Sequence, residues 1–391
     1  MSKSDFTHVL HRSVAAIDAG DWNAIVKGQN MYLSLDYLKS LESTMTPEMD
    51  FLYTLVYNKQ EEPVLVGVFQ LVTFLYKKND HPSKFLKHFH KDNDGNLSMN
   101  MLVCGNVFAG GENGFMQTEE ISYAEAIHQM VTIILHIKKE IKTSKKITVM
   151  LFKEFWSNSF SESDLFTDFQ FQGFQVDVNM ILRMHPSWKT MEDYLFSMKT
   201  KFRTKAKGVF KKSNSLELRS LSYDQIVTYQ ERIKELFKNV VEKSQYTYGA
   251  IKPQAFGAFK KALGDAFSFR AAFYQDTMVG FSTSFFHKGI MEANYVGMDY
   301  QFNQDLAVYQ RLLYDYVEQG ISKEVTELQF GRTSELLKSS LGAEPTNMTL
   351  FARHKATIPN IFMASMLRNV SPSEFELRKP FKSKFMEEWI R

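Results

Sequence analysis

The fold is decided by residues 267–298, which read FSFRAAFYQDTMVGFSTSFFHKGIMEANYVGM. Apolar side chains recur at every second position from Phe267 to Phe273, a spacing that indicates a β-strand. Turns at 275–277 and 287–289 separate this strand from two more, at 279–286 and 290–298. After them we expect, in order, a polar loop at 299–305, a helix from about Leu306 to Gly320, a strand at 325–330, a short helix at 333–341 and a last strand at 347–353.

The first half of the chain repeats this series in the same order. We expect strands at 51–58, 63–76 and 97–104, a glycine-rich loop at 105–115, a helix at about 122–141, a strand at 147–152, a short helix at 165–171 and a last strand at 179–185. A duplication of this length predicts two similar domains, each an α/β (α+β) fold with helices on the faces of a mixed sheet. We expect them at 1–188, with a helical lead-in, and at 189–391, with a linking helix and a C-terminal tail.

Composition limits the classes of function. The chain has 391 residues, enough for two domains, and a formal net charge of +3, which makes no case for a stable nucleic-acid complex. The single cysteine, Cys104, excludes a disulfide framework and a multi-cysteine metal site. His81, His88 and His90 form the one histidine cluster, in a polar stretch that we interpret as a loop, so we expect no metal. We see no signal peptide and no membrane-spanning stretch, and we expect a cytoplasmic protein.

Several short runs resemble one family of transferases. They are YLS at 32–34, LKSLE at 38–42, NYVG at 294–297, LLY at 312–314, FGRT at 330–333 and SSLGAEP at 339–345. Together they resemble the FemAB-like acyltransferases of the double-GNAT type, which are similar to acyl-CoA N-acyltransferases and to aminoacyl-tRNA-dependent peptidoglycan transferases. The resemblance implies two tandem GNAT-like domains, N-acyltransferase activity, and an acyl donor held by one half.

The resemblance also indicates where a donor would bind. In the second half the loop before the long helix offers unpaired backbone N–H groups at a helix start, which suit a pyrophosphate. The predicted contacts to acyl-CoA are Gln301, Asn303, Leu306 and Ala307. The glycines usual in this loop are absent, and Asp305 would repel phosphate unless it caps the helix.

The first half offers a second candidate for the donor site. Its glycine-rich loop contains Gly105, Asn106 and Gly111, and glycines allow a ligand to approach the backbone closely. The alternative interpretation of this loop is a plain surface turn. The sequence leaves open which half binds the donor.

Acylation of an amine needs an acid for the leaving thiolate and a base for the amine. Tyr309, at the start of the long helix, is our candidate for the acid. Tyr295 and Asn294 could face the acceptor, and Glu292 could be the base, two residues away from Asn294 and so on the same strand face. The alternatives are core packing for Tyr309 and a solvated position for Glu292.

Two further features indicate how substrates could be held. Arg332 follows a strand end, a position suited to a carboxylate or phosphate of the acceptor, with Lys338 assisting; the alternative for Arg332 is an ion pair with Glu335 or Glu344. Residues 199–212 carry seven positive charges and predict an amphipathic helix with a basic face, for CoA phosphates, a tRNA backbone or an anionic membrane surface, or simply a solvated face.

Three functions therefore stay open. The first is an N-acyltransferase that uses an acyl-CoA or an acyl-carrier protein and a small amine. The second is an aminoacyl-tRNA-dependent transferase acting on a cell-wall precursor, which the basic helix favours. The third is a binding protein without catalysis, which the missing loop glycines favour.

Overall fold

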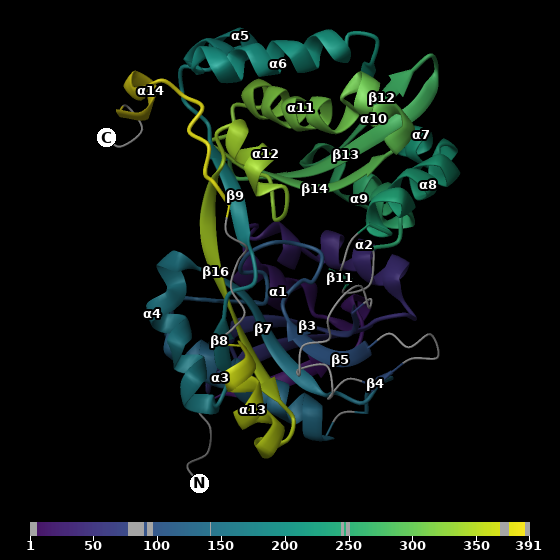
Figure 1. Ribbon diagram of the computed structural model, residues 1–391. Helices are drawn as coiled ribbons and strands as arrows, with labels where there is room; N and C mark the ends of the chain where they lie inside the picture. Colours follow the sequence, from purple (N-terminus) through teal and green to yellow (C-terminus); the bar gives the residue numbers. More distant parts are fainter. Residues whose placement is uncertain are drawn as a thin grey trace. The chain divides into compact units, whose positions relative to one another are not determined.

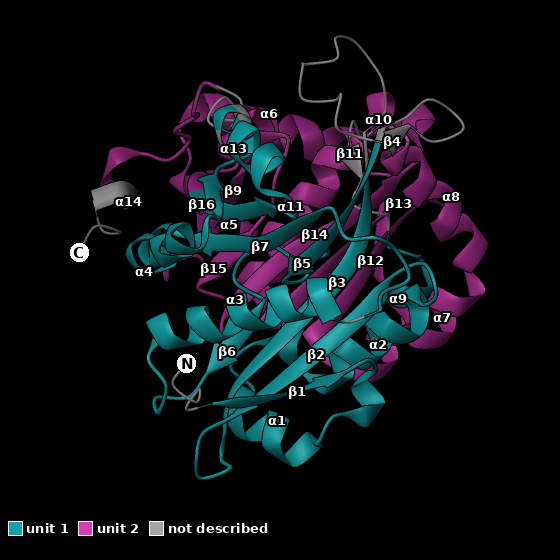
Figure 2. Ribbon diagram, turned by 90° about the horizontal axis from the view of Figure 1, so that it is seen from below, with its two compact units in different colours: residues 1–176, 244–255, 347–372 teal, residues 177–243, 256–346, 373–391 magenta. Residues whose placement is uncertain are grey.

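The computed structural model describes residues 6–76, 90–91, 97–140, 142–243, 246–247, 251–367 and 375–387 (Figure 1). The chain divides into two compact units, coloured in Figure 2. Unit 1 contains residues 1–176, 244–255 and 347–372; unit 2 contains residues 177–243, 256–346 and 373–391. The side chains of the histidine cluster at 81–90 lie outside the described residues.

Unit 1 is built on a mixed sheet. The strands are β1 (Thr7–His11), β2 (Asp50–Tyr57), β3 (Pro63–Tyr76), β5 (Leu97–Cys104), β7 (Val149–Trp156) and β16 (Glu344–His354), side by side in that order. The pair β5–β7 is parallel, and the other neighbours are antiparallel. Short strands β4 (His90–Lys91), β6 (Phe115–Gln117), β8 (Gln172–Phe174) and β11 (Tyr246–Thr247) pair with members of this sheet.

Helices cover the sheet of unit 1. Helix α3 (Tyr123–Glu140) packs an apolar stripe that includes Ile127, Met130 and Ile134 against side chains of β2, β3, β5 and β7. Helices α1 (Ala19–Val26) and α2 (Leu35–Met45) bury Trp22, Tyr37 and Leu41. Ser34 caps α2, because its hydroxyl accepts a hydrogen bond from the N–H of Tyr37.

Unit 2 is built on a second mixed sheet. Its strand order is β9 (Val178–Arg183), β15 (Glu327–Gln329), β14 (Ile290–Met298), β13 (Thr277–His287), β12 (Phe267–Tyr274) and β10 (Glu217–Ser220). The pair β14–β15 is parallel and the other neighbours are antiparallel. Helix α11 (Val308–Ser322) covers one face, whereas α8 (Gln230–Val241) and α9 (Gln254–Leu263) lie on the other (Figure 1).

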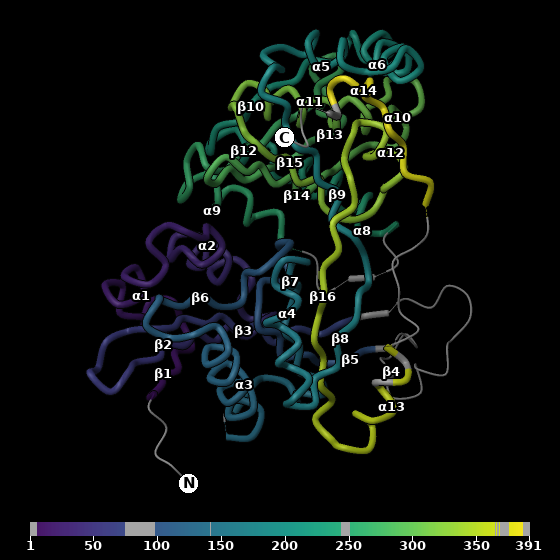
Figure 3. The backbone as a smooth tube through the Cα atoms, turned by 90° about the vertical axis from the view of Figure 1, so that its left-hand side faces the viewer, coloured from purple at the N-terminus to yellow at the C-terminus, as the bar shows by residue number. Residues whose placement is uncertain are grey.

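The two halves of the duplication exchange their last strands. Strand β9 ends the first repeat but pairs in unit 2 with β15, where Leu182 lies opposite Leu328. Strand β16 ends the second repeat but pairs in unit 1 with β7, where Phe351 lies opposite Phe152 (Figure 3). Each sheet is therefore completed by a strand from the other repeat.

The remaining helices are shorter or lie at the edges of the units. They are α4 (Phe160–Ser163), α5 (Met191–Ser197), α6 (Thr200–Lys212), α7 (Tyr223–Thr228), α10 (Tyr300–Leu306), α12 (Glu335–Ser340), α13 (Thr357–Leu367) and α14 (Ser383–Glu387). Among the described residues, no helix combines the length and the apolar character needed to cross a bilayer.

The predicted strands and long helices are confirmed to within a few residues, and one predicted loop is wrong. The stretch at 299–305 forms helix α10, which begins after Asp299, whose carboxylate accepts the N–H of Gln301 at 3.1 Å. Asp305 lies inside this helix and caps nothing. Ala307 then adopts a left-handed conformation (φ 48°), and α11 follows at once without a side-chain cap.

Candidate functional site

A cavity of about 430 Å³ lies in unit 2 where two parallel strands part. Strands β14 and β15 pair only from Ile290 opposite Glu327 to Glu292 opposite Gln329. Beyond that point the cavity is lined from both strands and from the helices that follow them, by Val240, Ala293, Asn294, Val296, Met298, Tyr300, Asn303, Tyr309, Leu313, Tyr316, Phe330, Gly331, Arg332, Thr333, Ser334 and Lys338. Five of the predicted site residues are brought together here: Asn294, Asn303, Tyr309, Arg332 and Lys338.

A β-bulge in β14 determines which side chains face this cavity. The register steps from Ser282 opposite Val296 to Ser284 opposite Ala293, so β14 carries one extra residue. Ala293 and Val296 then both pack on the α11 side of the sheet, and Asn294 lines the cavity there. The ring of Tyr295 lies on the other face.

The bulge overturns one expectation about the predicted catalytic residues. Glu292 precedes the bulge and alternates with Ala293, so it points away from the face that Asn294 occupies. The prediction that Glu292 and Asn294 share a face is therefore wrong. Tyr295 packs against the rings of Phe237 and Phe256, with centroid separations of 5.9 and 5.5 Å.

Lys338 is a buried lysine in the wall of the cavity. Its side chain is 4% exposed, and its ammonium group donates to the backbone carbonyl of Gly331 at 3.2 Å and to that of Arg332. Burial lowers the pKa of Lys338 to about 7, although the carboxylate of Glu335 acts in the opposite direction. The lysine thus fixes the segment that carries Arg332.

That segment has an unusual backbone. Gly331, Thr333 and Ser334 all have positive φ angles, of 72°, 63° and 55°. For Thr333, a β-branched residue, this conformation is costly and persists only where surrounding contacts impose it. One such contact is the side-chain oxygen of Asn179 in β9, which accepts the N–H of Gly331 at 3.1 Å. Sequence reasoning missed Asn179, because its effect depends on the exchanged strand.

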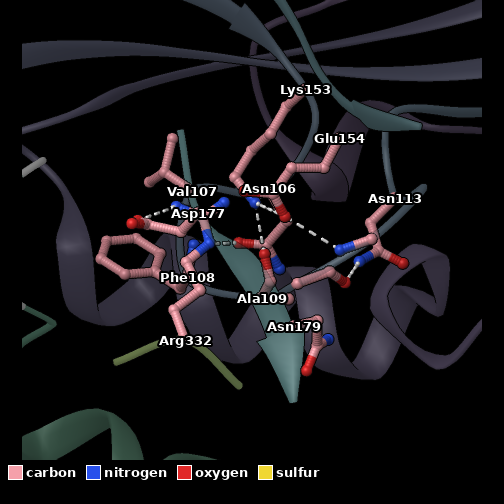
Figure 4. A network of polar contacts seen from close by, with 12 residues as sticks. Asn106, Val107, Phe108, Ala109, Asn113, Lys153, Glu154, Asp177, Asn179 and Arg332 are labelled. Atoms are coloured by element: carbon pink, nitrogen blue, oxygen red, sulfur yellow. Dashed lines mark hydrogen bonds and ion pairs between the residues drawn. The ribbon is translucent and has the colours of Figure 1, made fainter. Parts of the chain in front are cut away.

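Arg332 lies near a carboxylate other than the two expected from the sequence. Its guanidinium is 3.9 Å from the carboxylate of Asp177, a long ion pair (both side chains are labelled in Figure 4). Burial lowers the pKa of Arg332 to about 10, and burial followed by repulsion from Glu335 raises the pKa of Asp177.

Tyr309 stands at the start of α11 with its hydroxyl group largely buried. Burial raises its pKa above the ordinary value, and a hydrogen bond with Ser334 partly opposes that effect. Its backbone N–H donates to the side-chain oxygen of Asn303 at 2.9 Å. One of the N–H groups expected to bind a donor phosphate is therefore already engaged.

The other predicted donor contacts of unit 2 lie away from the cavity wall. The N–H of Gln301 is used in capping α10. Leu306 and Ala307 pack into apolar clusters beneath α11. Their predicted role at a donor site gains no support from this geometry.

The glycine-rich loop of unit 1 is tied down from within its own unit (Figure 4). The side chain of Asn106, 2% exposed, donates to the hydroxyl of Tyr37 at 2.8 Å. The N–H of Gly111 donates to the carboxylate of Glu154 at 2.9 Å, and Glu154 pairs with Lys153 at 2.7 Å. These contacts are typical of a structural loop.

The glycines of this loop serve close packing. A Cβ on Gly111 would lie 2.6 Å from the indole ring of Trp156, and one on Gly105, whose φ is 134°, would lie 2.9 Å from the side chain of Lys153. A smaller cavity of about 230 Å³ in unit 1 is lined by Cys104, Glu112 and neighbours, without the predicted Gly105, Asn106 and Gly111. Burial raises the pKa of Cys104 well above its ordinary value, which disfavours a reactive thiolate.

Helix α6 has the predicted basic face. Its only fully buried side chains are the apolar Ala206 and Val209. Six lysines at 199–212 are exposed and Arg203 is half-buried. In the described part of the chain, no cluster of three or more His, Cys, Asp or Glu side chains is arranged to hold a metal ion.

No protein-family model and no curated protein sequence matches this chain. Solved structures do match it over most of its length. A tandem GNAT protein from the clavulanic acid biosynthesis pathway is 7% identical, with a TM-score of 0.52 over 90% of this chain and 99% of that one. FemX is 11% identical, with a TM-score of 0.51 over 88% and 96%.

A third match is the C-terminal domain assigned to a lysylphosphatidylglycerol synthetase from Agrobacterium fabrum. It is 9% identical, with a TM-score of 0.51 over 92% of this chain and 97% of that one. Identities this low carry information about the fold alone. The match over about nine tenths of the chain identifies it as a protein with the tandem GNAT fold.

Proposed function

We propose that the chain is an N-acyltransferase that moves an acyl group from an acyl-CoA, or from an acyl-carrier protein, to a small amine. The observation that carries the proposal is the cavity where β14 and β15 part, with Tyr309, Arg332 and Lys338 in its wall. A thioester carbonyl fits between parted strands, where polar side chains of the cavity wall can polarise it.

The proposed reaction is direct transfer. The amine nitrogen attacks the carbonyl carbon, the C–N bond forms, the C–S bond breaks and the thiolate leaves. Lys338 takes the proton that the amine loses, because a pKa of about 7 leaves much of it neutral at neutral pH. Tyr309 gives a proton to the thiolate, since burial keeps its hydroxyl protonated.

The other predicted residues either line the cavity or lie on the opposite face of the sheet. Arg332 holds a carboxylate or phosphate of the acceptor, and Asn294 orients the amine from the β14 side of the cavity. The proposed centre excludes Tyr295 and Glu292, because both side chains lie on the opposite face of the sheet. Lys338 also acts on position, through its hydrogen bonds to the backbone that carries Arg332.

The geometry around α10 bears on the identity of the donor. Helix α10 stands where a phosphate-binding loop was expected, and Asn303 engages the N–H of Tyr309. This arrangement favours a donor whose phosphates lie away from the start of α11. An acyl-carrier protein, whose arm has a single phosphate, is such a donor.

A second candidate is an aminoacyl-tRNA donor, which replaces the thioester by an ester. The observation that favours it is helix α6, whose exposed lysines include Lys201, Lys205 and Lys207. A polyanion would gain from such a face in a salt-dependent way, without a long-lived complex. We propose the cytoplasm as the location.

The deciding experiment titrates the protein with CoA, acetyl-CoA and palmitoyl-CoA, by thermal shift and calorimetry. Stabilisation that grows with ligand concentration supports the thioester donor and ranks chain lengths. Tyr309→Phe should keep donor binding while lowering the transfer rate by about 100-fold. Tyr223→Phe, at an exposed position, is the matched control.

The alternative outcome is also specific. If no CoA compound binds but aminoacyl-tRNA binds in a salt-dependent way, and Lys205→Gln with Lys207→Gln weakens that binding, the second candidate is favoured. If neither donor class binds, both candidates are wrong and a non-catalytic role gains support.

A further inference from the structure

Helix α13 of unit 1 presents an apolar face that the described part of the chain leaves exposed. Ile358, Ile361 and Phe362 are 69%, 66% and 59% exposed. They stand at positions i, i+3 and i+4, so they form one continuous stripe on the helix surface. Single exposed apolar residues are common on proteins, but a helical stripe of three large ones marks an interaction surface.

The opposite side of α13 anchors it to its unit. Asn360, 6% exposed, donates to the carbonyl of Gln170 at 2.9 Å and accepts the N–H of His354 at 2.8 Å. Met363 and Leu367 are buried on the same side. The helix is therefore held so that its exposed stripe faces outward.

Three lysines gather near the start of α13. The charges that act on the Lys355 ammonium group, just before α13, are those of Lys146 and Lys138. Partial burial, followed by these two like charges, lowers the pKa of Lys355. Lys138 and Lys146 are exposed. Such crowding of positive charge would be relieved by a neighbouring anionic surface.

We infer that α13 and the lysines 138, 146 and 355 form a docking surface for an anionic lipid bilayer. In this arrangement Ile358, Ile361 and Phe362 enter the boundary between head groups and acyl chains, and the lysines lie level with the anionic head groups. Helix α13 has 11 residues, too few to span a bilayer, so on a membrane it would lie in the interface.

The same observations disfavour the two other occupants. A second copy bound through a twofold axis would place this patch against itself and bring the lysines of both copies together. A nucleic acid would satisfy the lysines, but its phosphate backbone offers nothing to the two isoleucines and the phenylalanine. A bilayer with anionic head groups satisfies both parts of the surface. The inference is independent of the proposed acyl transfer.

The test is binding of the full chain to phosphatidylcholine vesicles with and without phosphatidylglycerol, measured by co-sedimentation. We expect binding to the anionic vesicles only, weakened by salt. The double variant Ile361→Ser with Phe362→Ser should lose affinity by about tenfold or more. Lys138→Gln with Lys146→Gln should lose about fivefold for each lysine.

Matched controls separate this surface from other exposed features. Val227→Ser removes an apolar side chain that is 50% exposed on α7. Lys205→Gln with Lys207→Gln removes two exposed charges from α6. Both controls should bind anionic vesicles as the unmodified chain does. Circular dichroism of every variant establishes that it has folded.

A second readout reports the depth of the contact. The sole cysteine, Cys104, is buried, so Phe362→Cys offers one accessible thiol for an environment-sensitive fluorophore. Its emission should shift to the blue with anionic vesicles. The inference is overturned if the chain binds no vesicles, if only the α6 variant weakens binding, or if the chain is a dimer in solution that the α13 variant dissociates.

Discussion

Replacing Lys338 by methionine should change how the stability of the protein depends on pH. The ordinary pKa of a lysine is 10.5, and burial lowers that of Lys338 to about 7. Below about pH 7 the group is protonated in the folded and the unfolded chain, and above 10.5 it is neutral in both. Between these values the unfolded chain holds one more proton, so the free energy of unfolding rises with pH.

The size of the effect follows from the same two values. The difference between the two pKa values corresponds to about 5 kcal/mol of unfolding free energy, which is gained at about 1.4 kcal/mol for each pH unit. Because Lys338 is 4% exposed, solvent screening does little to reduce this figure. The variant also leaves the carbonyls of Gly331 and Arg332 without their donor, but that loss does not vary with pH.

The assay is urea unfolding of the unmodified chain and of Lys338→Met from about pH 6 to about pH 10. We expect the difference in unfolding free energy between them to move by several kcal/mol in favour of the unmodified chain as pH rises. Lys201→Met, which removes an exposed lysine of α6, is the control. A difference that stays constant with pH would refute the reasoning and mean that Lys338 stays charged.

Three other substitutions test separate features of the molecule. Arg332→Ala should raise the KM for the acceptor by about 100-fold with little change in donor binding; equal effects on both substrates would contradict its role. Gly111→Ala should cost about 2 kcal/mol in thermal unfolding, because φ is 82° and an indole ring fills the space, whereas Gly208→Ala in open space on α6 should stabilise slightly. Asp315→Asn should cost about 3 kcal/mol, since it removes the negative charge and one of the two acceptor oxygens that Arg270 now binds at 2.8 and 3.0 Å.

The sequence predicted where the strands and helices lie better than it predicted which strands pair. Alternating apolar residues such as those from Phe267 to Phe273 are a local signal, and β12 was found where that signal lies. The exchange of β9 and β16 has no local signal, because Val178–Arg183 would look the same beside either sheet. Helix α10 was missed since Asp299, two residues before Gln301, caps it earlier than the expected Asp305.

The candidate site was predicted only in part, because local sequence patterns reveal some of its residues and not others. Tyr309, Arg332 and Lys338 lie in or next to runs with a recognisable pattern, and all three line one cavity. The bulge that separates Glu292 from Asn294 leaves the strand pattern of β14 almost unchanged, so the faces could not be assigned. Asn179 lies far away in sequence, and only the exchanged strand brings it to Gly331.

The exchange of last strands also affects how the protein can be made. On the ribosome the first repeat emerges early, yet the edge of β7 stays uncovered until β16, at the end of the second repeat, has been synthesised. During that interval β7, whose residues are almost all buried in the finished protein, exposes a row of unpaired peptide groups. A chaperone that shields this edge until β16 has been synthesised would then raise the yield of folded protein.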